Sequence, residues 1–137
     1  EFNIEDLYVS ACVALWRPAS RSIVYSTAGL HPPMISRDGE MHIATEFANG
    51  LPLGVSTDEK FSSRKVALEQ GDRVFLFTDG VGDLLRHQGH AGSTVRCIAD
   101  ALTLVRHGRL RPVFQNLLFG NKTPPQDDSL LVGCEVL

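Results

Sequence analysis

Apolar positions in the first part of the chain fall into short runs that are rich in β-branched and aromatic residues and are separated by turn residues. These runs predict strands over residues 7–16, 22–28, 34–36, 41–44, 61–68 and 73–78. Asp38-Gly39 supplies the positive φ of a tight turn, and residues 69–72 connect the last two runs. The pattern therefore predicts two hairpins and an antiparallel sheet, with an irregular loop over residues 49–54.

The second part of the chain changes to a helical period. Apolar residues recur at helical spacing at Val95, Ile98, Leu102 and Val105, and again at Leu110, Val113, Phe114, Leu117 and Leu118. Ser93 or Thr94 is suited to cap the first helix, and Gly120 stands where the second would stop. A final apolar run over residues 130–137 predicts a strand. Strands, two helices and a returning strand predict an α+β fold whose helices cover one face of the sheet.

Composition narrows the class of protein. The chain has 137 residues, of which 43% are hydrophobic, and this suits a single domain over residues 1–137 with its own core. A net charge of −3 provides no basic field for nucleic acid, and the basic stretch 106–111 suits a helix end and loop. No apolar run reaches the roughly 20 residues that a membrane-spanning helix needs, and the N-terminus is acidic where a signal peptide would be basic. We therefore expect a cytoplasmic protein that binds neither nucleic acid nor membrane.

The cysteines support the same compartment. Cys12, Cys97 and Cys134 are odd in number, widely spaced, and each lies in an apolar element. This arrangement suits buried free thiols in a reducing environment better than a disulfide framework or a zinc site.

Two acidic signals stand beside predicted buried strands. The apolar run 73–77 ends on a Thr-Asp-Gly sequence centred on Asp79, and Asp127 and Asp128 precede the final strand. If the two strands are neighbours, these carboxylates meet and offer the oxygen ligands that Mg²⁺ or Mn²⁺ prefers. Taken alone, each also has a plain structural interpretation, Asp79 as a turn residue capping the segment after it and Asp127 as a loop residue.

Five motifs in a fixed order carry a family resemblance. They are Ala28-Gly29-Leu30-His31-Pro32-Pro33, Gly50-Leu51-Pro52-Leu53-Gly54, Gln70-Gly71-Asp72-Arg73, Phe77-Thr78-Asp79-Gly80-Val81 and Asp127-Asp128-Ser129-Leu130-Leu131. Together they resemble the metal-dependent (PPM, type-2C) protein phosphatases, and more narrowly the bacterial SpoIIE and RsbU branch. The resemblance extends from about residue 7 to the C-terminus.

This resemblance implies a β-sandwich flanked by helices, with a two-metal site between the sheets. It implies that Asp79 and Asp127 are metal ligands, whereas Asp128 is less suited because related enzymes often carry Asn there. Mg²⁺ or Mn²⁺ would activate a water for attack on phosphoserine or phosphothreonine, so no catalytic residue is needed beyond the metal ligands. The implied substrate is a phosphorylated signalling protein such as an anti-sigma-factor antagonist, and the implied regulator is an upstream sensor or receiver domain.

Two departures from the family qualify these expectations. The Gly-Gly-Asp and Asp-x-x-Gly-His-Gly motifs that supply the remaining ligands in the family's N-terminal half are not found here. We therefore expect the chain to be the C-terminal portion of the domain, with its N-terminal part missing, and to be inactive alone. The family also usually has Ala-Gly-His where this chain has its histidine one residue later, so no role is carried over to His31.

Alternatives remain at several positions. The chain could be a non-catalytic, partner-binding pseudophosphatase module, and a truncated sandwich could self-associate through unpaired strands. Asp83 could face the metal site through water, although a solvated first-turn carboxylate is the plainer interpretation. His87 and His90 have a zinc-like spacing, but the nearby glycines favour a mobile polar loop. The loop 50–54 suits either a substrate channel or a tight crossover.

Overall fold

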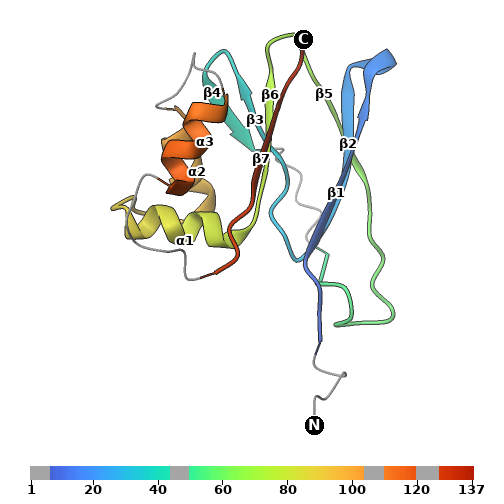
Figure 1. Cartoon of the computed structure of the whole chain (residues 1–137). Coiled ribbons are helices and arrows are strands. Elements are labelled where there is room, and N and C mark those ends of the chain that lie inside the picture. The colour runs from blue at the N-terminus through green and yellow to red at the C-terminus, as the bar shows by residue number, and fades with distance from the viewer. Residues whose placement is uncertain (1–6, 44–49, 104–109, 120–126) are drawn as a thin grey trace.

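Two antiparallel sheets face each other in the computed structural model, which describes residues 7–43, 50–103, 110–119 and 127–137 (Figure 1). One sheet has the strand order β1-β2-β5 and consists of β1 (Ala11–Arg17), β2 (Ser22–Ala28) and β5 (Arg64–Ala67). The other has the order β4-β3-β6-β7 and consists of β4 (Glu40–Ile43), β3 (Met34–Arg37), β6 (Arg73–Phe77) and β7 (Leu131–Glu135). A short 3-10 helix, η2 (Pro18–Ser20), joins β1 to β2.

Three helices pack on the outer face of the four-stranded sheet: α1 (Asp79–His87), α2 (Thr94–Thr103) and α3 (Leu110–Phe119) (Figure 1). Alternation along the strands builds a core on each side of that sheet. Met34, Phe75 and Phe77 point to the helices, where they meet Leu85 and Ile98. On the opposite face, Ile35 and Val74 meet Ile23 and Leu68 between the sheets. The predicted α+β class and the helical cover on one face are confirmed, and the sandwich implied by the resemblance is present.

The first predicted hairpin is confirmed. Met34 pairs with Ile43 and Arg37 with Glu40, in antiparallel register. Asp38 and Gly39 adopt φ values of 51° and 80°, the left-handed conformation that the Asp-Gly pair was expected to supply. The strand predicted over residues 22–28 is also observed with those bounds.

The second predicted hairpin is wrong. β5 and β6 do not pair with each other, because β5 pairs with β2 in one sheet and β6 with β3 and β7 in the other. Residues 69–72 therefore form a crossing between the sheets. The flanking apolar residues Leu68 and Val74 are both buried in the core between the sheets, which a change of sheet satisfies as well as a hairpin would.

Helix α1 was not predicted. Gly80 and Gly82 lower the helical propensity of this segment and weaken its apolar pattern. The structure gives both glycines a packing reason, because a Cβ on Gly80 would lie 2.6 Å from the carbonyl oxygen of Asp128 and one on Gly82 would overlap Thr94. The absence of side chains lets α1 approach its neighbours closely, and this benefit is not visible in local sequence.

The helices predicted further along are observed as α2 and α3. The amide of Arg96 lies 3.4 Å from the hydroxyl of Ser93, as expected for a residue that caps α2. Val105, Gly120 and the basic stretch 106–109 lie outside the described residues. Within the described ranges, no helix has the length and apolar character needed to cross a bilayer.

The three cysteines differ from the expectation that each would be buried. Cys97 on α2 is buried as expected, Cys12 is half-buried, and Cys134 on the edge strand β7 is exposed. Burial raises the pKa of the Cys12 thiol, which disfavours its thiolate. Cys134 pairs with Val74 of β6 and lines an open hollow between the sheets, so it faces that side of the sheet without being covered.

Candidate functional site

Asp79 lies where the central strand β6 gives way to α1. β6 ends at Phe77, Thr78 takes the extended conformation of an N-cap residue, and the Thr78 carbonyl accepts the Val81 N–H at 3.1 Å. Asp79 is the first residue of the helix, where a negative charge is favoured by the helix dipole. Its side chain is 59% exposed, so its carboxylate is open to a ligand.

Strand β7 brings the second acidic segment to the same place. Phe77 pairs with Leu131, and the Thr78 N–H donates to the Leu130 carbonyl at 3.0 Å. The Thr78 hydroxyl donates to the Asp128 carbonyl at 2.9 Å and accepts the Leu130 N–H at 2.9 Å. The residues on both sides of Asp79 therefore touch the segment that contains Asp128, since Gly80 also packs against its carbonyl.

Asp127 and Asp128 are both exposed on this segment. One carboxylate oxygen of Asp127, Oδ1, accepts the Asp128 N–H at 2.8 Å, and the Asp127 carbonyl accepts the Ser129 hydroxyl at 3.2 Å. Among the described residues, the second carboxylate oxygen of Asp127 has no hydrogen-bond partner. The structure thus brings Asp79 and the segment of Asp127 to one end of the sheet, as the sequence suggested.

His31 is a site residue that sequence reasoning missed. It follows β2 in the connection to β3, and its Nε2 lies 3.4 Å from Oδ1 of Asp79. Its ring also packs against Phe77, with centroids 5.8 Å apart and planes inclined by 31°. The one-residue displacement from the family pattern gives no sign of this contact, because the partner of His31 is a side chain from a different element.

The donor set at this end of the molecule has a clear chemical preference. Asp79 and Asp127 offer carboxylate oxygens, which suit hard cations such as Mg²⁺ or Mn²⁺. Among the residues that the structure describes, no three His, Cys, Asp or Glu side chains come together as a complete metal-binding group. These residues therefore fit part of a coordination shell, and further ligands would be required to complete it.

The other candidate residues lie apart from this chemistry or have different partners. Asp83, in the first turns of α1, forms an ion pair with Arg86 on the same helix. His87 is the last residue of α1, so the polar loop predicted there is wrong at this position. His90 follows in a turn, where its N–H donates to the Leu85 carbonyl at 3.1 Å.

The Gly50–Gly54 loop has the contacts of a tight crossover. The Gly29 N–H donates to the Gly50 carbonyl at 2.9 Å, and Leu53 exchanges two backbone hydrogen bonds with Val9 at 2.8 and 2.9 Å. A Cβ on Gly50 would lie 2.7 Å from the ring of Phe61. The crossover interpretation therefore accounts for the glycine without a substrate channel.

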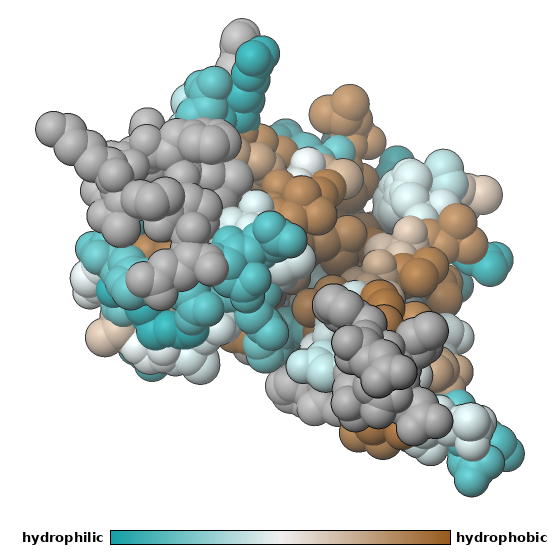
Figure 2. Space-filling view, turned by 60° about the horizontal axis from the view of Figure 1, so that its bottom comes forward, coloured by the Kyte–Doolittle hydropathy of each residue, from teal (hydrophilic) through white to brown (hydrophobic). Residues whose placement is uncertain are grey.

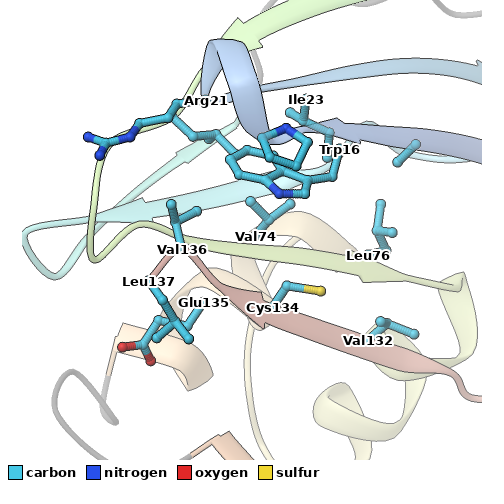
Figure 3. A pocket seen from close by; sticks show the side chains of 13 residues that line it. Trp16, Arg21, Ile23, Val74, Leu76, Val132, Cys134, Glu135, Val136 and Leu137 are labelled. Atoms are coloured by element: carbon cyan, nitrogen blue, oxygen red, sulfur yellow. The ribbon is translucent and has the colours of Figure 1, made fainter.

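A separate apolar hollow of about 520 Å³ opens between the sheets, toward the end at which the C-terminus lies (Figures 1 and 3). Figure 3 shows Trp16 and Ile23 from the three-stranded sheet above Val74 and Cys134 from the four-stranded sheet. None of the candidate metal ligands lines it. This hollow is therefore distinct from the carboxylate site.

Comparison with known protein families decides the relationship. The family model of Stage II sporulation protein E (SpoIIE) matches residues 2–137, which is nearly the whole chain. The chain belongs to the SpoIIE family. A search of curated protein sequences finds no significant match.

Solved structures similar to this chain include phosphatase domains. The phosphatase domain of SpoIIE from Bacillus subtilis matches with a TM-score of 0.70 and 11% identity, over 94% of this chain and 59% of that one. The RsbU and RsbW domains of Rv1364c from Mycobacterium tuberculosis match with a TM-score of 0.68 and 25% identity, over 90% of this chain and 35% of that one. RsbX in complex with magnesium matches with a TM-score of 0.63 and 14% identity, over 90% of this chain and 54% of that one. The fold is that of PP2C phosphatase domains, and this SpoIIE-family chain spans less than two thirds of each of these structures.

Proposed function

We propose that these residues form the C-terminal portion of a metal-dependent protein phosphatase domain. Membership of the SpoIIE family supports this, and so does the match to 59% of the B. subtilis phosphatase domain. The exposed apolar surface points the same way, because Val13 and Leu15 of the edge strand β1 are 69% and 54% exposed. Apolar side chains also gather across the middle of the face in Figure 2. A surface of this kind suits contact with further protein.

In this proposal Asp79 and Asp127 hold part of a Mg²⁺ or Mn²⁺ centre. The observation that carries it is the contact of Thr78 and Gly80 with the backbone of Asp128, which draws the two acidic segments together at one sheet end. The magnesium complex of the similar protein RsbX supports the choice of a hard divalent cation. The remaining ligands would come from residues outside this set.

The reaction that fits such a site is hydrolysis of a phosphate ester by water. A bound divalent cation would supply the polarisation of the phosphate oxygens and the activation of the water. The chain's own residues fix the geometry: Thr78 ties the end of β6 to the start of β7, and the close approach of Gly80 sets where α1 begins. No side chain of the chain needs to act as a nucleophile.

We assign the substrate to phosphoserine or phosphothreonine in a signalling protein such as an anti-sigma-factor antagonist. The similarity to a chain that contains RsbU and RsbW domains supports a regulatory partner of this class. Control by an upstream sensor or receiver domain belongs to the same proposal.

Turnover of p-nitrophenyl phosphate with Mn²⁺ tests the assignment. We expect no activity above background from residues 1–137 alone, and activity from the parent protein with a complete phosphatase domain. Asp79→Asn and Asp127→Asn should each abolish that activity. Asp83→Asn is the matched control, because it removes a carboxylate from the same helix that is paired with Arg86. Robust, Asp79-dependent turnover by the 137 residues alone would contradict the partial-site proposal.

Release of phosphate from matched phosphopeptides then tests the substrate class. The active parent protein should hydrolyse phosphoserine and phosphothreonine peptides and leave the phosphotyrosine peptide of the same sequence nearly untouched. Preference for phosphotyrosine would overturn the substrate assignment without affecting the metal site.

A non-catalytic binding module is the second candidate, and one observation favours it. The described residues do not assemble three metal-binding side chains. The two candidates differ in the coding sequence upstream of residue 1: glycine-flanked aspartates there support the enzyme, and their absence supports the binding module. Self-association through the exposed edge strands β1 and β7 is a related possibility, and a single monomeric species in sedimentation at high concentration would argue against it.

A further inference from the structure

The backbone around His31 holds that residue in a defined place. Gly29 has φ 68° and is tied to Gly50 by a hydrogen bond of 2.9 Å, and a Cβ on Gly29 would lie 2.6 Å from Pro52. Pro32 and Pro33, which follow His31, are both buried. Proline fixes φ and has no N–H, so this connection has few alternative conformations. The connection runs from one sheet to the other (Figure 1). It places His31 beside Asp79.

Two contacts set the orientation of the His31 side chain. Its ring packs against Phe77, which is itself only 7% exposed and belongs to the helix–sheet core. Its Nε2 lies 3.4 Å from Oδ1 of Asp79. Phe77 and Asp79 lie two residues apart on either side of the β6–α1 junction, so the ring is directed toward the carboxylate by a rigid part of the fold.

In this contact a histidine nitrogen lies beside the carboxylate that is proposed to bind the metal. Nε2 of His31 lies 3.4 Å from Oδ1 of Asp79, within ion-pair distance, and the side chain of Asp79 is 59% exposed, so its carboxylate remains open to a cation. In metal sites, the hydrogen-bond partners of ligating carboxylates fix ligand orientation, and their loss typically weakens metal binding about 10–100-fold. Asp83 has its ion-pair partner, Arg86, on its own helix, whereas the partner of Asp79 comes from the connection between the two sheets.

We infer that His31 is a positioning residue that orients the carboxylate of Asp79 for a divalent cation. This inference rests on the proposed function, because it assigns Asp79 to a Mg²⁺ or Mn²⁺ centre. His31 acts through Asp79 and contacts neither the phosphate nor the attacking water. The displacement of the histidine by one residue from the family pattern is therefore compatible with a role, since the connection between β2 and β3 brings the side chain back to the site.

The contact itself is tested without metal, in the 137-residue chain. In ¹⁵N-histidine NMR spectra, Asp79→Asn should shift the side-chain resonances of His31 and leave those of His87 unchanged. Asp83→Asn is the control and should leave His31 unchanged. Identical His31 resonances in the wild-type chain and in Asp79→Asn would overturn the inference.

The effect on the cation is tested in the parent protein with a complete phosphatase domain, by measuring free Mn²⁺ from its electron paramagnetic resonance signal. His31→Ala should weaken Mn²⁺ binding about 10–100-fold, and His31→Gln, which retains an N–H donor, should recover most of the loss. His87→Ala should bind Mn²⁺ like the wild type. Asp79→Asn serves as the reference and should weaken binding at least as much as His31→Ala.

The outcomes separate this inference from the function on which it rests. If Asp79→Asn weakens Mn²⁺ binding and His31→Ala does not, the role of His31 is wrong and the proposed metal site stands. If Asp79→Asn has no effect on Mn²⁺ binding, both are wrong. A His31→Ala enzyme with normal Mn²⁺ affinity and a raised KM for a phosphopeptide would show that His31 contacts the substrate, which also overturns the inference.

Discussion

Two aspartates flank the central strand β6, and their surroundings are opposite. Asp72 precedes the strand and is 1% exposed. Its carboxylate accepts hydrogen bonds from Nε and Nη2 of Arg37 at 3.0 and 2.6 Å and from the Glu69 N–H at 2.7 Å. Asp79 follows the strand, is 59% exposed, and has His31 at 3.4 Å. The first carboxylate is saturated by the protein, and the second is available to a ligand.

The difference shows that the fold surrounds one aspartate with internal donors and leaves the other accessible. Burial by itself would raise the pKa of Asp72, but the hydrogen bonds from Arg37 and Glu69 and the charge of Arg37 outweigh it and lower that pKa. Asp72 thereby holds the crossing between the sheets, where β5 leads into β6. At Asp79 the protein leaves the carboxylate largely unpaired, which is a cost that functional sites commonly carry.

The contrast extends to the neighbouring groups. A polar hollow of about 460 Å³ lies around Arg37 and Asp72. Two further ion pairs line it, with Arg37 2.8 Å from Glu69 and Arg73 3.1 Å from Glu135. At the other end, Asp127 and Asp128 are exposed beside Asp79. Charge alone therefore does not distinguish a binding site from a structural network, whereas the supply of internal donors does.

The largest effect is expected from removing the buried carboxylate. Asp72→Ala should lower the free energy of unfolding by about 3 kcal/mol, because it deletes three hydrogen bonds and leaves Arg37 without its main partner. Urea denaturation followed by circular dichroism measures this. Asp100→Ala is the control, since Asp100 forms only an exposed pair with Arg96 at 3.8 Å, and it should change stability by less than about 0.5 kcal/mol. A loss at Asp72 no larger than at Asp100 would contradict the structural role.

Acid should remove part of the same stabilisation. The pKa of Asp72 is lower in the folded protein than its ordinary value, so its contribution is fully present above the ordinary aspartate pKa of about 3.9 and is lost as the pH falls through the folded value. The difference in unfolding free energy between the wild type and Asp72→Asn should therefore be constant from pH 7 to about pH 5 and shrink at lower pH. Urea titrations across this range measure it. A difference that grows on acidification would have the wrong sign for a depressed pKa.

A smaller effect is expected at the junction that joins the two acidic segments. Thr78→Val should cost about 1–2 kcal/mol, because the hydroxyl of Thr78 makes two hydrogen bonds to the segment before β7. Thr78→Ser keeps the hydroxyl and should retain most of the stability. In the parent protein, Thr78→Val should also weaken Mn²⁺ binding, because the side-chain link between the segments of Asp79 and Asp127 would be lost and only the backbone pairing would remain. Equal behaviour of the Val and Ser variants would show that this hydroxyl does not connect the segments.

Much of the fold could be predicted from the sequence, and the predictions that were wrong or missing have physical reasons. Hydrophobic period identified the strand at residues 22–28, the Asp38-Gly39 hairpin and the helices α2 and α3, because each of these is encoded within a few neighbouring residues. The hairpin expected at residues 69–72 failed because alternation within a strand does not reveal which sheet the strand joins. Helix α1 was not predicted, because the advantage of Gly80 is its close approach to Asp128, which lies far along the chain.

The candidate site was likewise predictable only where the signal lies in neighbouring residues. Asp79 and Asp127 were recognisable because each precedes or follows an apolar run in the sequence, and the pairing of Phe77 with Leu131 puts them at one sheet end. Their assignment as metal ligands remains a prediction. His31 was not recognisable, because its contact with Asp79 depends on the crossing between the sheets and on the position of Phe77. Residues that act through a side chain of another element leave little local signal.

The smallest effect on stability is expected at the second aspartate. Asp79→Asn removes a favourable charge at the start of α1, worth roughly 0.3–1 kcal/mol, but the group is largely exposed and its contact with His31 is long. We expect the free energy of unfolding to fall by about 0.5 kcal/mol or less in urea denaturation, compared with the larger loss for Asp72→Ala. A large loss of unfolding free energy in Asp79→Asn would mean that the Asp79 carboxylate makes stabilising contacts within the protein, as the Asp72 carboxylate does. Such a loss would place Asp79 in the same structural class as Asp72 and remove the main physical reason for regarding it as a free ligand.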